Sequence, residues 1–541
     1  MSDGTYRVPE PTNEPVRGYA PGSPERATLE AELAAQRGEV VEAPNVIAGE
    51  DVRTGETFAQ RAPHDHGLVL AEVHAAGVAE VERAIEAAQA ARAEWAATPF
   101  ADRAAIFLRA ADLLAGPWRD RINAATILGQ SKSVQQAEID AACELIDFLR
   151  FNVAFAEQLH TEQPLSVPGE WNRLELRPLD GFVLAITPFN FTAIAGNLPT
   201  APAIMGNTVL WKPSEKQAVA AHHTMRLLQA AGLPDGVINL LHGDGARVAE
   251  VATADERFAA LHFTGSESVL SSLFERIGRQ AGRYTSFPRI VGESGGKDFV
   301  LAHTSADVDR LAVALGRGAF EYQGQKCSAA SRAYLPRSVW ERVRDPLADI
   351  ATSMTMGDVG TDLSTYLGAV ISEGAFRTHA AAIERARREG AEVVVGGTPD
   401  DTDGWFVPPT VLVTDDPRSH TMTTELFGPI LTVFVFDDGG FDAILPEVDQ
   451  ATRYALTGAV FAEDRAVLAR ATEALRGTAG NLYLNDKPTG SVVGRQPFGG
   501  SRRSGTNDKA GSPFNLLRWA SPRAIKETWA APTEWRYPHQ G

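Results

Sequence analysis

The chain has 541 residues, 44% of them hydrophobic, and its 51 basic and 69 acidic side chains give a formal net charge of −18. Because one hydrophobic core stops growing near about 250–300 residues, this length predicts two or three domains. The acidic balance argues against a nucleic-acid partner, which needs a concentrated basic patch, and the sequence has no apolar run near the roughly 18 residues of a membrane span.

The printed sequence begins Met1-Ser-Asp-Gly-Thr-Tyr-Arg, which has neither the apolar core of a signal peptide nor the arginine-rich face of a transit peptide. We therefore expect a cytoplasmic protein. Its 2 cysteines cannot form a disulfide framework, and no C-x-x-C or H-E-x-x-H spacing offers a metal site. The chemistry is expected to be organic, with no metal.

The first 160 residues change character twice. Residues 1–40 are rich in Pro, Gly and Glu and predict an arm over the surface with little core. Short apolar runs between Gly and Asp over 48–75 predict a small β-meander. From 78 to about 158, apolar residues recur at intervals of three and four, which predicts amphipathic helices. The helical spacing around Cys143 explains that cysteine as packing.

A turn-rich strip at 161–180 predicts a projecting hairpin, and beyond it strands and helices alternate. Apolar runs of strand length occupy 182–186, 208–211 and 237–241, with a helical pattern at 218–231. This alternation is typical of a parallel sheet covered by helices. Such sheets bind ligands at the carboxyl ends of their strands.

Polar clusters follow these strands, in Thr187-Pro-Phe-Asn190-Phe191, Lys212-Pro-Ser-Glu215 and Phe263-Thr-Gly265-Ser266. A lysine at a strand end can hold a ribose or phosphate, and a helix beginning near Gly265 can direct its N–H groups at a pyrophosphate. No G-x-G-x-x-G fingerprint is present, so each cluster is also compatible with a solvated turn or a helix cap.

Two later stretches carry groups suited to covalent catalysis. Cys327, in Tyr322-Gln-Gly-Gln-Lys-Cys-Ser328, is a candidate nucleophile, and a nearby cation and backbone N–H groups are expected to raise its thiolate fraction. Glu293 precedes a flexible Gly-Gly and can activate the water that hydrolyses an acyl adduct. The alternatives are a small buried hydrophobe for the cysteine and a solvated turn for the glutamate.

Taken together, in order and spacing, these motifs and Glu425-Leu-Phe427-Gly-Pro resemble the aldehyde dehydrogenase superfamily from about residue 40 to the end. Asn485-Asp-Lys-Pro-Thr-Gly490-Ser491 and Gln496-Pro-Phe498-Gly-Gly further resemble the 1-pyrroline-5-carboxylate dehydrogenase branch, which completes proline catabolism. The resemblance implies an α/β fold with a Rossmann-like NAD-binding domain, an α/β catalytic domain and a β-hairpin oligomerisation flap.

The resemblance also implies roles for individual residues. Cys327 attacks the aldehyde, the amide of Asn190 and the backbone N–H of Cys327 bind the oxyanion, hydride passes to NAD, and Glu293 activates water to release glutamate. The implied NAD-binding residues are Thr187, Lys212, Glu215, Gly265, Ser266, Glu267, Ser268, Val269, Glu425 and Phe427. The implied substrate-binding residues are Phe191, Ser328, Gly490, Ser491, Phe498 and Glu144, the last with an exposed helix carboxylate as the alternative.

Two positions depart from the superfamily's common pattern, Ser294 after the base and Glu267 after Ser266. A carboxylate at Glu267 would disfavour the extra phosphate of NADP, and Glu215 points more strongly to NAD. The expected domains are an arm at 1–40, an NAD-binding domain from 41–160 and 181–295, a catalytic domain at 296–516, and oligomerisation elements at 161–180 and 517–541.

Three functions fit the sequence. The first is the oxidation of L-glutamate γ-semialdehyde with NAD, in a homo-oligomer that is at least a dimer and pairs functionally with proline dehydrogenase. The second keeps the fold but assigns another semialdehyde or release of the acyl group to CoA, against which Glu293 argues because a hydrolytic base competes with transfer. The third is a non-catalytic scaffold that retains the fold.

Overall fold

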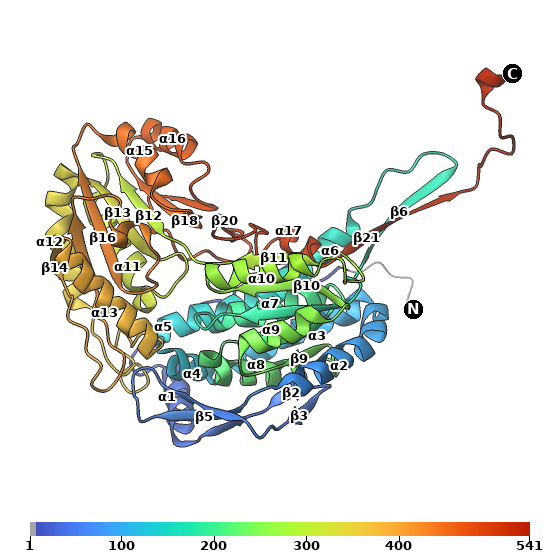
Figure 1. Cartoon of the computed structure of the whole chain (residues 1–541), viewed down its shortest axis with the longest axis horizontal. Coiled ribbons are helices and arrows are strands. Elements are labelled where there is room, and N and C mark those ends of the chain that lie inside the picture. The colour runs from blue at the N-terminus through green and yellow to red at the C-terminus, as the bar shows by residue number, and fades with distance from the viewer. Residues whose placement is uncertain (1–6) are drawn as a thin grey trace.

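Two seven-stranded sheets, each covered by helices, form the two lobes of the computed structural model, which describes residues 7–541 (Figure 1). The α/β fold predicted from the sequence is confirmed. Within the described residues, no helix is both long enough and apolar enough to cross a membrane.

The sheet of the first lobe has the strand order β11-β10-β7-β8-β9-β2-β3. Its five strands from β11 to β9 are parallel, while β2 and β3 add an antiparallel edge. The predicted alternation of strand and helix is therefore present. The strands are β2 (Asn45–Ile47), β3 (Glu50–Val52), β7 (Phe182–Thr187), β8 (Thr208–Pro213), β9 (Ile238–Leu240), β10 (Phe258–Thr264) and β11 (Arg289–Glu293).

Helices cover both faces of this sheet, and their apolar faces meet apolar strands that are buried on both sides. They are α2 (Val78–Ala97), α3 (Phe100–Ala115), α4 (Arg119–Gln130), α5 (Val134–Ala137), the π-helical turn η1 (Glu138–Cys143), α6 (Glu144–Thr161), α7 (Thr192–Ile204), α8 (Ala218–Ala230), α9 (Gly245–Ala254) and α10 (Glu267–Arg279).

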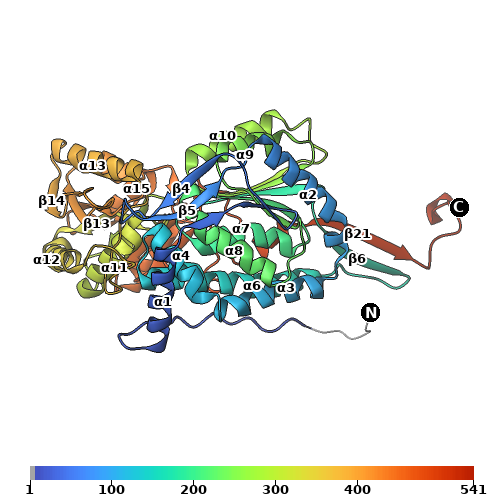
Figure 2. The same cartoon turned by 90° about the horizontal axis from the view of Figure 1, so that it is seen from below.

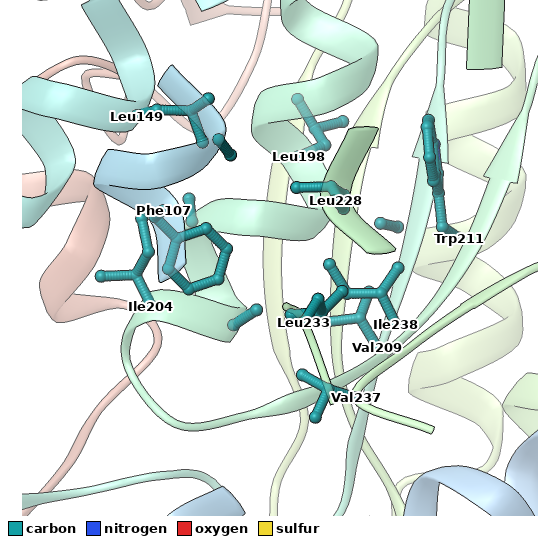
Figure 3. Packing of buried hydrophobic residues seen from close by; sticks show 14 of the residues in the cluster. Phe107, Leu149, Leu198, Ile204, Val209, Trp211, Leu228, Leu233, Val237 and Ile238 are labelled. Atoms are coloured by element: carbon teal, nitrogen blue, oxygen red, sulfur yellow. The ribbon is translucent and has the colours of Figure 1, made fainter. Parts of the chain in front are cut away.

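One large cluster of buried side chains joins the helices to this sheet (Figure 3). Trp211 and Val209 of β8, Phe107 of α3 and Leu228 of α8 are all buried there. Burying each such side chain is worth about 1.5–3 kcal/mol relative to leaving it exposed.

The second lobe has the strand order β14-β15-β16-β13-β12-β18-β19, parallel except for β14 at its edge. Its strands are β12 (Asp298–Ala302), β13 (Ala330–Pro336), β14 (Glu392–Val395), β15 (Thr410–Thr414), β16 (Ile430–Phe436), β18 (Thr457–Phe461) and β19 (Asn481–Leu484). Its helices are α11 (Val308–Phe320), α12 (Arg337–Ser353), α13 (Glu373–Arg388), α14 (His420–Thr423), α15 (Phe441–Gln450) and α16 (Arg465–Ala474).

The expectation of little core in residues 1–40 is wrong. Helix α1 (Pro24–Gly38) begins at an N-cap, Ser23, whose side chain accepts a hydrogen bond from the backbone of Arg26. Leu29 and Leu33, four residues apart on one face, are buried in the core beneath it. Before α1, the chain from residue 7 runs in an extended course beside α3 and α6 (Figure 2). Residues 1–6 lie outside the described part.

The predicted β-meander over 48–75 is only partly present. Strands β4 (Thr57–Arg61) and β5 (Val69–His74) pair in antiparallel fashion, but β3 joins the large sheet instead. Strand β1 (Val41–Ala43) lies on the other side of β5 and runs parallel to it. The short strands are shared between two sheets because β2 and β3 complete the edge beside β9.

The strip at 161–180 projects from the first lobe, as predicted, but it is not a hairpin by itself. Strand β6 (Glu170–Arg177) pairs along its whole length with β21 (Ser521–Thr528), in antiparallel fashion (Figure 1). Residues before β6 contact it mainly through side chains, such as that of Gln163 with the backbone of Leu174. The second strand of the flap therefore comes from the carboxyl end of the chain, after α17 (Pro513–Leu517).

Candidate active site

The ends of four neighbouring strands in the first lobe lie on one edge. Ile186 of β7 is in register with Lys212 of β8 and with Phe263 of β10, which is in register with Gly292 of β11. The polar groups that follow these positions therefore stand side by side, as the sequence predicted. This is the edge at which a parallel sheet binds its ligand.

Three of the predicted NAD-binding residues lie at this edge, and their side chains have different surroundings. The hydroxyl of Thr187 accepts a hydrogen bond of 3.1 Å from the indole of Trp211, so it is engaged within the sheet. The Lys212 side chain is buried, and burial lowers the pKa of its ammonium group. Glu215 is exposed in the short turn beyond β8, and its charge partly offsets that lowering.

Helix α10 begins at this same edge. Ser266 is its N-cap and accepts from the backbone N–H of Val269, whose side chain is 45% exposed. The Ser268 hydroxyl lies 3.2 Å from that of Ser266. The carboxylate of Glu267 is engaged elsewhere, because it pairs with Arg503 and accepts a hydrogen bond from Ser271. The proposed effect of Glu267 on NADP is therefore not supported by its position.

The turn before Cys327 has an unusual backbone. Tyr322, Gln323 and Gly324 all have left-handed conformations, with φ of 51°, 53° and 64°. Such backbone costs about 1–3 kcal/mol for each residue other than glycine and persists only where its surroundings fix it. The side-chain amide of Gln323 fixes this backbone by donating hydrogen bonds to the carbonyls of Ser131 and Ala369 at 2.9 and 2.8 Å.

Gly324 is required for a second reason, since a Cβ there would lie 2.2 Å from the carbonyl oxygen of Gly428. The side chain of Gln325 fixes the next position by accepting from the backbone of Ile371 at 2.8 Å. The nucleophile therefore sits on a turn whose shape is set by buried hydrogen bonds.

The sequence predicted that the surroundings of Cys327 raise its thiolate fraction, and the structure shows the opposite. Burial raises the pKa of its thiol well above the usual range, and the carboxylates of Asp298 and Glu293 raise it further. The adjacent cation, Lys326, does not offset this, because its ammonium lies 3.3 Å from Asp140. The free enzyme therefore holds a protonated thiol that needs a base.

Glu293 ends β11 and accepts a hydrogen bond of 2.8 Å from the backbone N–H of Gly500. Burial raises the pKa of this carboxyl group to about 8, in spite of that hydrogen bond. The neighbouring Ser294 donates through its hydroxyl to the carbonyl of Arg503 at 2.6 Å. The unusual serine therefore ties β11 to the loop that binds Glu293.

Asn190 connects the two lobes. Its side-chain amide is buried and donates to the carbonyl of Gln325 at 3.0 Å, two residues before Cys327. An amide group has two N–H donors, so one remains for another acceptor.

A cavity of about 310 Å³ lies between the lobes, and it brings the catalytic candidates together with the predicted substrate residues. Cys327 and Glu293 line it. So do Phe191, Ser328, Gly490, Ser491, Phe498 and Glu144.

Details of this lining extend the prediction. The Ser328 hydroxyl donates to that of Thr489 at 2.8 Å, a contact that the sequence did not indicate. The alternative of an exposed helix carboxylate is wrong for Glu144, because burial raises the pKa of that group well above its usual range. Asn190 is not among the residues that line the cavity, and neither is Lys212.

Glu425 and Phe427 reach Cys327 from another side and line a narrow crevice with it. Glu425 accepts from the backbone N–H of Gly296 at 3.0 Å, and burial raises its pKa to about 7. Phe427 has a left-handed backbone, with φ of 56°, and its ring meets that of Phe189 edge-on at 5.8 Å.

The sequence did not reveal a buried network of charges beside the cavity. Lys132 is fully buried, lies 2.5 Å from Asp140, and stands 4.3 Å from the ring centre of Phe191. The same Asp140 contacts Lys326, which precedes the nucleophile. No periodic signal marks such residues. Cys143 is buried, as predicted, although its sulfur accepts from Arg119 at 3.3 Å as well as packing.

A strand edge that carries a helix N-terminus, and a half-buried cysteine and a half-buried glutamate that line one cavity, are the arrangement of a class of enzymes that oxidise aldehydes. A profile of the aldehyde dehydrogenase family matches residues 51–525, and the chain belongs to this family.

Among its relatives, a mitochondrial Δ1-pyrroline-5-carboxylate dehydrogenase from Bos taurus is 48% identical over 97% of this chain and 94% of its own length. A crystal structure of the Δ-pyrroline-5-carboxylate dehydrogenase from Mycobacterium tuberculosis bound with NAD is 58% identical, with a TM-score of 0.96 and 100% of both chains covered. Proline utilization A from Bdellovibrio bacteriovorus is 30% identical, with a TM-score of 0.90, over 97% of this chain and 55% of its own.

Proposed function

We propose that this protein oxidises L-glutamate γ-semialdehyde, formed when 1-pyrroline-5-carboxylate opens in water, to L-glutamate with NAD. The observation that carries the proposal is the single cavity lined by Cys327, Glu293 and the Gly490–Ser491 turn. It combines a nucleophile and a base with donors suited to a second, non-reacting carboxylate.

The first step is the attack of the Cys327 sulfur on the aldehyde carbon. The thiol proton passes to the carboxylate form of Glu293, which is a stronger base than an ordinary carboxylate because its pKa is raised to about 8. A C–S bond forms, and the carbonyl oxygen becomes an oxyanion. The free N–H of the Asn190 amide and the backbone N–H of Cys327 are the donors for it.

The residues at the strand edge suit a dinucleotide. We assign Lys212 and Glu425 to the two riboses, the N–H groups at the start of α10 to the pyrophosphate, and Phe427 to the nicotinamide ring. The chemistry of the donors fits, because α10 begins at the same edge of the sheet as the buried ammonium group of Lys212. When bound, NAD accepts the hydride of the former aldehyde carbon and leaves a thioester on Cys327.

The last step is hydrolysis. Glu293 first releases the thiol proton to solvent. Its carboxylate then leaves the Gly500 N–H and removes a proton from water, and the hydroxyl oxygen attacks the thioester carbon. The C–S bond breaks, the sulfur regains a proton, and L-glutamate departs as a dicarboxylate. A base in this position argues against release of the acyl group to CoA.

The amino-acid end of the substrate needs its own anchor. The donors that we assign to the α-carboxylate are the N–H groups of Gly490 and Ser491 and the hydroxyls of Ser491 and Ser328, the last of which would turn from Thr489 to the substrate. Glu144 is assigned to the ammonium group, which would favour its charged form against the burial that now disfavours it. Phe191 and Phe498 flank the aliphatic chain.

The test compares NADH formation with pyrroline-5-carboxylate, succinate semialdehyde and acetaldehyde. We expect pyrroline-5-carboxylate to give the highest kcat/KM by at least about tenfold, because only its open form engages the whole anchor. Equal values would contradict the assigned anchor, and no NADH with any of them would favour a scaffold.

We also propose that the β6–β21 flap makes a homo-oligomer. Trp529 is 68% and Trp535 is 76% exposed beside it, and exposed apolar surface of this kind marks an interface. Light scattering after gel filtration should give at least a dimer, and a variant ending at residue 516 should give a smaller species.

Pairing with proline dehydrogenase and a cytoplasmic location remain predictions. The relative from Bdellovibrio bacteriovorus, which is named proline utilization A and is much longer than this chain, supports the pairing. The name of the bovine relative, by contrast, places that protein in mitochondria. Cell fractionation tests the location of this one.

A further inference from the structure

The extended arm of residues 7–19 forms part of the wall of the substrate cavity. Asn13, Glu14 and Val16 line that cavity together with Cys327. These arm residues lie far from the nucleophile in the sequence, and they approach it from the side of α6 and η1.

The side chain of Asn13 joins two elements across the opening. Its amide nitrogen donates to a carboxylate oxygen of Asp147, on α6, and to the carbonyl of Val493, both at 2.8 Å. Its amide oxygen accepts from the guanidinium of Arg495 at 3.0 Å. One short side chain therefore holds the segment 493–495 against α6.

That segment is continuous with the turn assigned to the substrate carboxylate. The backbone N–H groups of Arg495 and Gln496 donate to the carbonyl of Val492 at 3.0 and 3.1 Å, and the Gln496 side chain accepts from the N–H of Val492 at 3.0 Å. Residues 492–496 thus form one compact loop, directly after Gly490 and Ser491. A displacement of Val493 would move this turn.

The arm is itself fixed on both sides of Asn13. The backbone N–H of Glu14 donates to Asp147 at 2.7 Å, and the Glu14 carboxylate lies 2.8 Å from Arg150. Further along, the backbone of Arg17 and the hydroxyl of Tyr19 donate to the buried Glu138 at 2.8 and 2.9 Å. The arm therefore offers Asn13 a rigid support.

We propose that Asn13 is a positioning residue that holds the Gly490–Ser491 turn in place, and that the arm thereby selects aldehydes with a charged amino-acid end. This inference rests on the proposed function. Asn13 would not contact the reacting atoms. The effect of replacing it must therefore depend on whether the substrate has a carboxylate for the turn to bind.

The test is Asn13→Ala in the full-length protein, with Thr12→Ala as the matched control, since Thr12 is exposed on the same arm. We expect kcat/KM for pyrroline-5-carboxylate to fall about tenfold in Asn13→Ala, as for loss of a hydrogen bond to a charged group. The inhibition constant of L-glutamate should rise by the same factor. Propionaldehyde, which has neither charge, should be oxidised within about twofold of the wild-type rate, as should all substrates by Thr12→Ala.

An equal loss with propionaldehyde would show a general structural role and would overturn the inference, as would unchanged values with pyrroline-5-carboxylate and L-glutamate. Asn13→Ser carries the same test if the alanine variant does not fold. Failure of the proposed function is a different result, in which the wild-type protein itself does not oxidise pyrroline-5-carboxylate.

Discussion

The strand edge of the first lobe and the nucleophile turn of the second are built in different ways. Lys212 and the start of α10 take their places from strand register alone, because parallel strands that begin together end together. Cys327 follows three consecutive left-handed residues, whose conformation depends on side chains from other parts of the chain.

This difference predicts which substitutions alter ligand binding and which alter the reaction rate. A change at a ligand-binding group of the strand edge, such as Lys212, removes one contact with a ligand and leaves the sheet intact, so its effect should be confined to binding. Glu293 ends β11 at the same edge, but its carboxyl group lines the cavity with Cys327, so a change there belongs with the rate. A change at the turn reaches the reacting atoms or the bonds that fix them, so its effect should fall on the rate. Substitutions in the two regions can separate effects on binding from effects on rate.

The largest effect is expected for Cys327→Ala. Without the sulfur no thioester forms, so NADH production with pyrroline-5-carboxylate should fall by at least about 10⁴-fold. NAD binding, measured by quenching of tryptophan fluorescence, should stay within about twofold of the wild-type affinity. Residual turnover that resists this change would place the nucleophile elsewhere.

Glu293→Gln should separate the two halves of the reaction. Removal of a general base slows its step by about 10²–10⁴-fold, and we expect that loss in steady-state turnover. Rapid mixing should still show a burst of NADH of about one equivalent per site, formed more slowly than in the wild-type protein because solvent takes the thiol proton in place of Glu293. Normal steady turnover would contradict the assigned role.

Lys212→Ala tests the strand edge. Loss of one hydrogen bond from a charged group should raise the KM for NAD by about tenfold and change kcat by less than about twofold. Initial rates at varied NAD give both constants. A large fall in kcat with unchanged KM would end the proposed division between the two regions.

The smallest effect concerns pH. Burial raises the pKa of Glu293 to about 8, and only its carboxylate form can accept a proton. Steady-state turnover should therefore rise about fivefold from pH 7 to pH 8, with a midpoint near 8, where hydrolysis limits the rate. A flat profile in stopped-flow and steady-state measurements would contradict the assigned base.

The same contrast explains what could be predicted from the sequence. Lys212 follows an apolar run of strand length, and the rule for parallel sheets then brings it to the ligand-binding edge. Cys327 and Asn190 were assigned by resemblance, and the structure places them on either side of the join between the lobes.

Other features depend on contacts between distant segments, for which local pattern carries no signal. The partner of β6 is β21, from the far end of the chain, and the two buried leucines of α1 lie in a stretch whose composition suggested a surface arm. The pairing of Lys132 with Asp140 could not be predicted for the same reason. Asp140 also contacts Lys326, which therefore does not lower the pKa of Cys327.

The thioester on Cys327 is the central claim, and mass spectrometry of Glu293→Gln tests it most directly. The variant is mixed with pyrroline-5-carboxylate and NAD, stopped in acid and digested. We predict one glutamyl group on the peptide that contains Cys327 and none on the peptide that contains Cys143. A NADH burst without an adduct, or an adduct on Cys143, would contradict the account.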